Sequence, residues 1–359
     1  MRVAVITFPL INNYGGIIQA FAMMKLLEDL GHEPILVNCQ SESKLKSISK
    51  FIIKKHLLGF MSRFKGVTLT LKNKDLAKFV ETYISPKTTP ICNSQQLEKY
   101  FDSHKFDACV VGSDQVFAKM GYANFENDYS LGFIKNDMIK LSYGASFGAD
   151  RYQGDNDKVD FHKENLKKFA GISVREESGV KVCKDTFGVD STHVLDPTMM
   201  IDLSNYLNIV AEGSNDSDLE KNNELFAYVL DSNNVKTNEI QSFANEMGLS
   251  TRQINDGNAS ANVISMENWI GSIYYADHVI TDSFHGCVFC IIFNKPFHCY
   301  VNRKRGADRF LSLLNMFGLE DRIIESKISN DLINWDNVNT ILEENRAKSF
   351  DFILKHLRA

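Results

Sequence analysis

His285 lies in a sequence context that suits proton transfer beside an anionic substrate. Within residues 278–301, a short apolar run ends in the polar corner 282–286, and a helix-like apolar run and a second strand follow. His285 would lie at the start of that helix, beside unpaired backbone N–H groups that favour an anion. Ligands of open α/β sheets bind outside the carboxyl ends of the strands. The pattern therefore predicts a proton donor beside a phosphorylated or carboxylated substrate.

Two further strand ends carry groups of complementary chemistry. Asp114 lies on a glycine turn that ends one predicted strand, where a carboxylate could act as acid or base. Arg175 ends another, and its fork of N–H donors suits a carboxylate or phosphate. Structural alternatives stay open: a histidine satisfied within the core, a helix N-cap for Asp114, and an ion pair of Arg175 with Glu176 or Glu177.

A glycine turn near the N-terminus is another candidate binding element. It follows an apolar strand over residues 3–7 and precedes a helical pattern over residues 17–30. The turn has neither the GxGxxG pattern nor a P-loop lysine, so it gives little support to a dinucleotide site. Asn12, Asn13 and Gly15 could line a cleft, or the glycines could serve backbone geometry alone.

Strand and helix patterns alternate in two blocks, which predicts an α/β protein with two Rossmann-like domains. The first block covers residues 1–203. A polar, acidic stretch over residues 204–223 is typical of a linking region, and the second block extends over residues 204–335. A last helix over residues 336–359 is expected to pack back on the first domain.

Length and composition limit the classes of protein to which this chain could belong. A chain of 359 residues suits two domains, and 44% apolar and 24% charged residues are typical of a globular protein. The net charge of −5 gives no general reason to expect nucleic acid. The N-terminal apolar run is too short for a signal peptide, and no apolar stretch is long enough to span a membrane. A cytoplasmic protein is expected.

The cysteines predict buried thiols and not a metal site. There are seven, an odd number, and most lie inside apolar runs, which favours reduced thiols in a cytoplasmic core. Cys287 and Cys290 match CxxC, but their segment is apolar and no second Cys/His pair has metal-ligand spacing. Neither a metal nor a cofactor is predicted.

A basic segment over residues 41–74 interrupts the α/β rhythm. Lysines and arginines alternate there with large apolar residues, and Glu42 is the one acidic residue. A basic amphipathic helix could contact the cytoplasmic face of an anionic membrane. The alternative is a helical insertion that packs its apolar face on its own domain.

Six segments, taken together and in order, resemble the polysaccharide pyruvyl transferase family. They are NNYGGIIQAFAM, FDACVVGSDQVF, KLSYGASFG, GISVREESG, VLDPTMM and ADHVITDSFHGCVFCIIFNKPF. They extend over roughly residues 5–320, and several ordered matches are more specific than any single motif. The resemblance implies a fold like that of GT-B glycosyltransferases, with the active site in the cleft between two Rossmann-like domains.

The resemblance also implies a reaction and its residues. The reaction is transfer of pyruvate from phosphoenolpyruvate to a sugar as a cyclic ketal, with release of phosphate. His285 matches the catalytic histidine of the family, Arg175 its substrate-binding arginine and Asp114 its cleft acid. The expected acceptor is a sugar or lipid-linked oligosaccharide of a bacterial surface or capsular polysaccharide, and the sequence does not specify which sugar.

One position departs from the family pattern. Many members carry Arg-Leu before the histidine, where this chain has Ser-Phe, so a ligand-binding arginine is missing. We hypothesise that one of three later arginines supplies the charge. The expected substrate contacts are Asn13, Tyr14, Gly15, Ser113, Ser146, Ser283, Phe284, Arg303, Arg305 and Arg309.

Two other functions fit the same fold. One is a GT-B glycosyltransferase that uses a nucleotide sugar, and binding of a nucleoside diphosphate would distinguish it. The other is a glycan-binding or scaffold protein that has lost the chemistry. For that protein, changes at Asp114 or Arg175 would leave cellular function intact.

Overall fold

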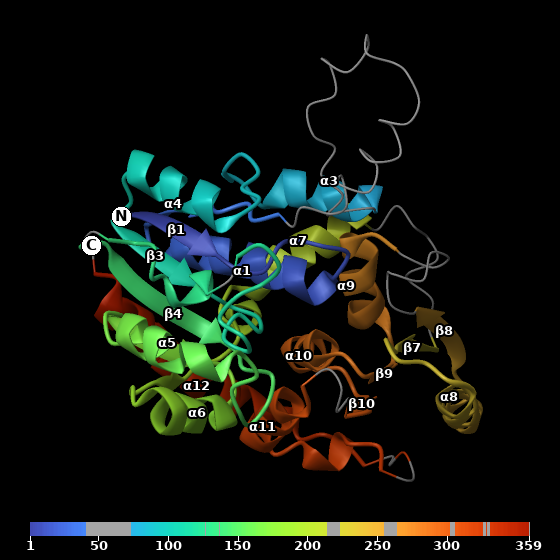
Figure 1. Cartoon of the computed structure of the whole chain (residues 1–359). Coiled ribbons are helices and arrows are strands. Elements are labelled where there is room, and N and C mark those ends of the chain that lie inside the picture. The colour runs from blue at the N-terminus through green and yellow to red at the C-terminus, as the bar shows by residue number, and fades with distance from the viewer. Residues whose placement is uncertain are drawn as a thin grey trace, which may run out of the picture.

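The computed structural model contains two parallel β-sheets, each with helices on both faces (Figure 1). It describes residues 1–40, 73–125, 127–135, 137–213, 223–254, 264–301, 306–325, 328 and 331–358. The basic segment predicted over residues 41–74 lies outside the described residues except for its last two. In the described part of the chain, no helix is long and apolar enough to cross a membrane.

The first sheet has six parallel strands in the order β2-β1-β3-β4-β5-β6. The strands are β1 (Arg2–Ile6), β2 (Glu33–Leu36), β3 (Ala108–Val111), β4 (Ile139–Ala145), β5 (Gly171–Val174) and β6 (Thr192–His193). Their short apolar runs are typical of strands buried on both faces. Because all six strands are parallel, their carboxyl ends meet at one edge.

Alternate residues of these strands pack in two different cores. Val3 and Val5 of β1 belong to one cluster of buried residues, and Ala4 and Ile6 to another, as the two-residue period of a strand requires. The first cluster includes apolar residues of α1 (Tyr14–Asp29) and α3 (Lys74–Tyr83). The second includes residues of α4 (Ser94–Ser103), α5 (Val159–Leu166) and α6 (Glu177–Phe187).

The second sheet has four parallel strands in the order β10-β9-β7-β8. They are β7 (Glu224–Tyr228), β8 (Ser250–Ile254), β9 (His278–Thr281) and β10 (Phe297–Cys299). One face packs on α9 (Met266–Tyr275) and α10 (Phe284–Ile292), and the other on α8 (Asn234–Met247). The helix α11 (Ala307–Phe317) follows.

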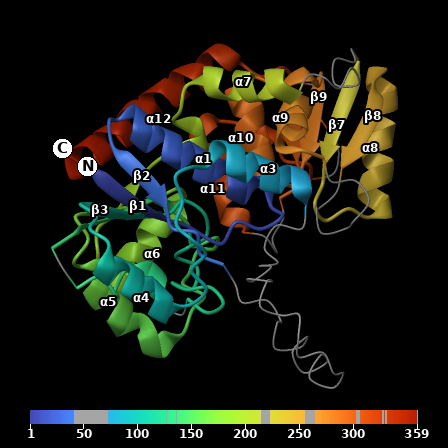
Figure 2. The same ribbon diagram turned by 90° about the horizontal axis from the view of Figure 1, so that it is seen from above.

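The two domains share one hydrophobic core. The cluster that contains Val5 of the first sheet also contains Phe226 of the second, with α1, α9 and α10 between them. In Figure 2, α1 and α3 lie between the first sheet and the second. The predicted α/β class, with two Rossmann-like domains in a GT-B-like arrangement, is confirmed.

The stretch predicted as a polar linker begins with a packed helix. Residues of α7 (Leu203–Gly213) include the buried Tyr206, Ile209 and Val210, and α7 packs against α9. The linker prediction was therefore wrong for residues 204–213. The polar residues of this stretch form the outer face of α7. Its three buried apolar residues are spaced as on one face of a helix, and the surrounding polar residues obscured that pattern.

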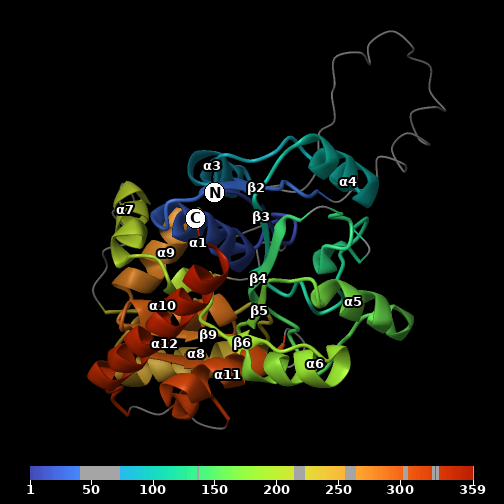
Figure 3. The same ribbon diagram turned by 90° about the vertical axis from the view of Figure 1, so that its left-hand side faces the viewer.

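The last helix, α12 (Trp335–His356), packs on the first domain. Ser349 Oγ accepts a hydrogen bond from Leu195 N at 3.0 Å, and Arg346 Nε donates to Met199 O at 2.6 Å. Both contacts hold the segment that follows β6. The N- and C-termini lie close together in all three views (Figure 3).

Candidate active site

Candidate residues from both domains meet where the carboxyl ends of the two sheets face each other. Asp114 follows β3, and Arg175 follows β5, two strands farther along the same sheet. His285 lies in the first turn of α10, directly after β9 of the second sheet. The structure therefore brings together the three residues that the sequence singled out for catalysis.

Arg175 is the centre of a buried charge network. Its Nη1 lies 2.6 Å from Asp196 Oδ2 and 3.1 Å from Ser113 Oγ, and its Nη2 lies 3.2 Å from Asp114 Oδ1. Burial by itself would lower the pKa of Arg175, but the charges of Asp196 and Asp114 outweigh burial and raise it. The guanidinium is therefore a permanent cation held by two carboxylates.

The neighbouring glutamates do not pair with Arg175, so that structural alternative is wrong. Glu176 is buried, and its Oε1 accepts hydrogen bonds from Phe147 N at 2.5 Å and Gly148 N at 3.3 Å. Burial raises the pKa of Glu176 above its ordinary value. Its carboxyl group fixes the loop after β4, and Ser146 Oγ supports the same loop by accepting from Gly148 N at 3.0 Å.

His285 packs against the glycine turn of the first domain. A Cβ atom built on Gly15 would lie 2.2 Å from His285 Nδ1, closer than any side chain allows. The ring is buried, and its Nε2 lies 3.7 Å from Asp196 Oδ2. Gly15 is therefore needed for the close approach of the imidazole, which the sequence had left open.

Asp196 is the member of the site that sequence reasoning missed. It follows β6 and begins a short 3-10 turn over Pro197–Met199. Burial by itself would raise the pKa of Asp196, but the adjacent His285 and Arg175 side chains lower it well below its ordinary value. The Asp-Pro-Thr sequence is typical of a strand end, and no function was predicted for it. The strand end itself was the available signal, because two other strand ends of the same sheet carry Asp114 and Arg175.

Phe284 and Arg309 complete the cationic side of the site. The guanidinium of Arg175 lies 4.8 Å from the centroid of the Phe284 ring, and that of Arg309 lies 5.4 Å from it. Burial, and then the charge of Arg175, lowers the pKa of Arg309 to about 10, so it stays cationic at neutral pH. Of the three hypothesised arginines, Arg309 lies at the site. Arg303 and Arg305 lie outside the described residues.

Three other residues that were predicted to contact substrate make hydrogen bonds within the protein. Asn13 caps α1 by accepting from Gly16 N at 3.3 Å, and Ser283 caps α10 by accepting from Gly286 N at 3.4 Å. Tyr14 OH lies 2.7 Å from Ile264 O and 3.1 Å from Ile264 N. Tyr14 thus links the first domain to the second. The caps made by Asn13 and Ser283 fix the N-terminal ends of α1 and α10, which face the site.

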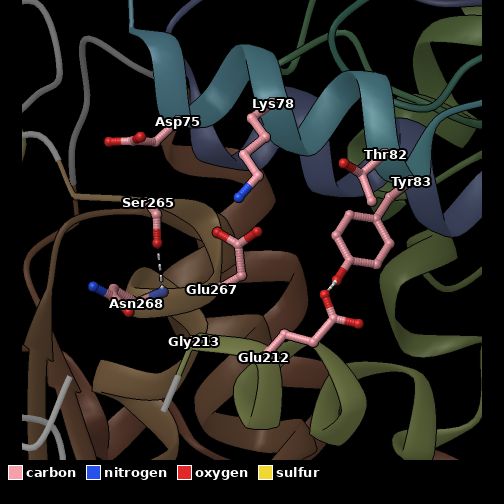
Figure 4. Close-up of a pocket in the computed structure, with 9 residues that line it drawn as sticks. All are labelled: Asp75, Lys78, Thr82, Tyr83, Glu212, Gly213, Ser265, Glu267 and Asn268. Carbon is pink, nitrogen blue, oxygen red and sulfur yellow. Dashed lines mark hydrogen bonds between the residues drawn. The ribbon is translucent and has the colours of Figure 1, made fainter. Parts of the chain in front are cut away.

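Two hollows in the described part of the chain differ in their suitability for an anion. A cavity of about 40 Å³ adjoins Asp114, Asn13 and Gly16, which is room for a few water molecules. A polar hollow of about 420 Å³ lies between α3, α7 and α9 (Figure 4). Its charged lining residues are Asp75, Lys78, Glu212 and Glu267. Three carboxylates and one ammonium disfavour a trianion there, and none of the predicted site residues lines it.

Fold and site together define a two-domain α/β enzyme whose polar residues converge at an interdomain site. The family model for polysaccharide pyruvyl transferase matches residues 13–304. The chain belongs to the polysaccharide pyruvyl transferase family and is an enzyme of that class. Comparison with curated proteins found no match.

Solved structures with some similarity have low sequence identity. UDP-GlcNAc 2-epimerase from Neisseria meningitidis, bound to UDP-GlcNAc, is 10% identical over 98% of this chain and 94% of that chain, with a TM-score of 0.49. UDP-N-acetylglucosamine 2-epimerase from Rickettsia bellii is 12% identical over 99% of both chains, with a TM-score of 0.47. A glycosyltransferase from Rickettsia africae ESF-5 is 10% identical over 98% and 93%, with a TM-score of 0.47.

Proposed function

We propose that this enzyme transfers the pyruvyl group of phosphoenolpyruvate to two hydroxyls of one sugar, forming a cyclic ketal and releasing phosphate. The acceptor would be a precursor of a surface polysaccharide. The observation that carries the proposal is the meeting of His285 from one domain with Asp114 and Arg175 from the other. An acid, a base and a fixed cation are the groups that this reaction needs.

The reaction is a series of proton transfers around one carbon. A proton added to C3 of phosphoenolpyruvate turns its methylene into a methyl group and leaves C2 cationic. One sugar hydroxyl adds to C2 and loses its proton, phosphate leaves, and the second hydroxyl adds to the oxocarbenium carbon. The second hydroxyl proton leaves in turn, so the two protons released balance those taken by C3 and phosphate.

Burial assigns roles to the two carboxylates. The side chain of Asp196 is 1% exposed, whereas that of Asp114 is 12% exposed and lines the small cavity. In the described part of the chain, the side-chain hydrogen bonds to Asp114, from Gln115 N and Arg175 Nη2, both reach Oδ1. Its Oδ2 is thus available to accept a hydroxyl proton, and His285 would protonate C3 or the leaving phosphate.

Charge in the site favours phosphoenolpyruvate, which is a trianion near neutral pH. Arg175 and Arg309 provide two buried cations on one aromatic ring. In a site of low dielectric, such charges attract an anion far more strongly than they do in water. The cavity beside Asp114 is too small for the donor, so the domains are expected to part when substrate enters.

Phosphate release from phosphoenolpyruvate, measured with a panel of galactose, mannose and amino sugar acceptors, tests the proposal. We expect release that depends on the acceptor, and a product with one pyruvyl methyl signal by NMR and no free keto group. Omission of the acceptor is the control. Binding of a nucleoside diphosphate, with no phosphate released from phosphoenolpyruvate in the presence of any acceptor, would instead support a glycosyltransferase.

A further inference from the structure

The Asp196 carboxylate occupies the junction between the cationic and the acid–base parts of the site. Its Oδ2 lies 2.6 Å from Arg175 Nη1 and 3.0 Å from Ser113 Oγ, and Oδ1 accepts from Thr198 N at 3.1 Å and Thr198 Oγ1 at 2.7 Å. Asp196 is 2% exposed. A carboxylate held by donors on both oxygens has no freedom to rotate toward a substrate.

The two ring nitrogens of His285 face different partners. Nε2 lies 3.7 Å from Asp196 Oδ2, and this atom is buried without a hydrogen-bond partner. Nδ1 lies on the side of Gly15, where even a methyl group would collide with it. The nitrogens of an imidazole differ in role according to the bond that each one makes. Here the carboxylate is on one side. The domain interface with its glycine turn is on the other, so Nδ1 becomes accessible to substrate when the domains part.

We propose that Asp196 is a positioning residue that holds the proton of His285 on Nε2, so that Nδ1 is the nitrogen that exchanges protons with substrate. This inference rests on the proposed pyruvyl transfer. The separation of 3.7 Å exceeds a hydrogen bond, and catalytic hydrogen bonds of substrate-free enzymes often tighten only when substrate binds. Asp196 then connects Arg175, which holds the phosphoenolpyruvate, to His285, which protonates the phosphoenolpyruvate.

The proton balance follows from this arrangement. Protonated His285 gives its Nδ1 proton to C3 and becomes the neutral tautomer that carries hydrogen on Nε2. Nδ1 is then free to take the proton of one sugar hydroxyl, which restores the starting state, and the proton that Asp114 takes from the other hydroxyl passes to the leaving phosphate. Asp196 stays ionised throughout, because Arg175 remains paired with it.

Kinetics of Asp196→Asn test the role, because the variant keeps the shape and removes the charge. We expect kcat to fall by about 10²-fold or more while KM for phosphoenolpyruvate changes less than about threefold. A merely structural role would displace Arg175 and raise KM instead. The matched control is Thr198→Val, which removes one hydrogen bond to the same carboxylate and leaves the charge, and whose kcat should change only a few-fold.

Nitrogen NMR of the folded full chain, labelled at histidine ring nitrogens, reads the tautomer directly. Subtraction of the His285→Ala spectrum assigns the signals among the nine histidines. We expect neutral His285 to carry hydrogen on Nε2, and Asp196→Asn to weaken that preference. Hydrogen on Nδ1 in the wild-type enzyme, or an unchanged kcat in a folded Asp196→Asn, would overturn the inference. Because the NMR result does not depend on turnover, failure of the inference and failure of the proposed function remain distinguishable.

Discussion

At the scale of single residues, the contact between Gly15 and His285 is the tightest constraint on the site. A Cβ on Gly15 would lie 2.2 Å from Nδ1, so Gly15→Ala must displace the imidazole or part the domains. We expect a loss of kcat of at least tenfold and a lower free energy of unfolding, because a clash in this buried interface costs about 1–3 kcal/mol and the helix preference of alanine returns only about 0.5–1 kcal/mol. Steady-state kinetics with a thermal melt check this.

Gly16 provides the matched control for Gly15. A Cβ there would meet its nearest atom, Asn13 Nδ2, at 3.5 Å, which is ordinary contact. Gly16→Ala should therefore leave the imidazole in place, and any loss should appear in KM for the acceptor, because the added methyl would lie 3.7 Å from Asp114 Oδ2. Equal losses in both variants would mean that the turn, and not the contact with the imidazole, matters.

Arg309 is expected to replace the arginine that the family pattern has before the histidine. Arg309→Met keeps most of the apolar stem and removes the charge. Since the donor is a trianion, KM for phosphoenolpyruvate should rise about tenfold or more, with a smaller effect on kcat. A variant with unchanged KM and normal folding would show that the cation binds no part of the donor.

The partners of these residues show what the sequence could and could not predict. His285, Asp114 and Arg175 each follow a clear apolar strand, so their positions at strand ends were predictable. The ion-pair partner of Arg175 was not predictable. Asp196 lies 21 positions later in the chain, and proximity in the sequence favoured Glu176 instead. Pairing across neighbouring strand ends depends on strand order, which local patterns do not encode.

At the scale of elements, Tyr14 connects α1 to the segment before α9. Its ring stacks on Trp269, with centroids 5.2 Å apart, and its hydroxyl makes both bonds to Ile264. Tyr14→Phe keeps the ring stacking and loses those hydrogen bonds. The free energy of unfolding should fall by about 0.5–1.5 kcal/mol for each bond lost. Denaturant titration should show this loss, and an unchanged midpoint would contradict the link.

A histidine pair makes the second sheet sensitive to acid. His278 of β9 and His298 of β10 share a hydrogen bond of 2.9 Å between Nε2 and Nδ1, and burial lowers their pKa values from 6.5 to about 3 and about 4. Below pH 6.5 the unfolded chain therefore binds protons that the folded chain does not. The free energy of unfolding should fall as pH drops from 6.5 toward 4, by at most about 2 kcal/mol per histidine at pH 5.

His298→Asn isolates this effect from general acid denaturation. Asparagine offers a partner near the former Nδ1 position and cannot titrate. The fall in unfolding free energy between pH 7 and pH 5 should be smaller in this variant than in the wild type. His104→Asn, at an exposed histidine, should keep the wild-type slope. Identical slopes in all three proteins would rule out the pair as the cause.

Element types were predictable where the apolar pattern is clear, and failed where tertiary packing reveals it. The polar α7 shows its apolar face only when α9 lies beside it. This error falls on the helix that follows the segment carrying Asp196. Tertiary packing, not local propensity, decides such segments.

At the scale of the whole molecule, one core spans both domains. Val5, Trp269 and Phe226 belong to the same buried cluster and α12 packs on the first domain, so a common core joins the two halves, and each half also has a smaller cluster of its own. We expect one cooperative unfolding transition in calorimetry, with equal calorimetric and van't Hoff enthalpies. Two resolved transitions would show that the halves unfold independently.

A crystal structure with phosphoenolpyruvate bound tests the central claim most directly. The account predicts the donor between the two sheets, with C3 within hydrogen-bonding distance of His285 Nδ1 and its charged groups at Arg175 and Arg309. Donor bound elsewhere, for instance in the carboxylate-lined hollow between α3, α7 and α9, would contradict it.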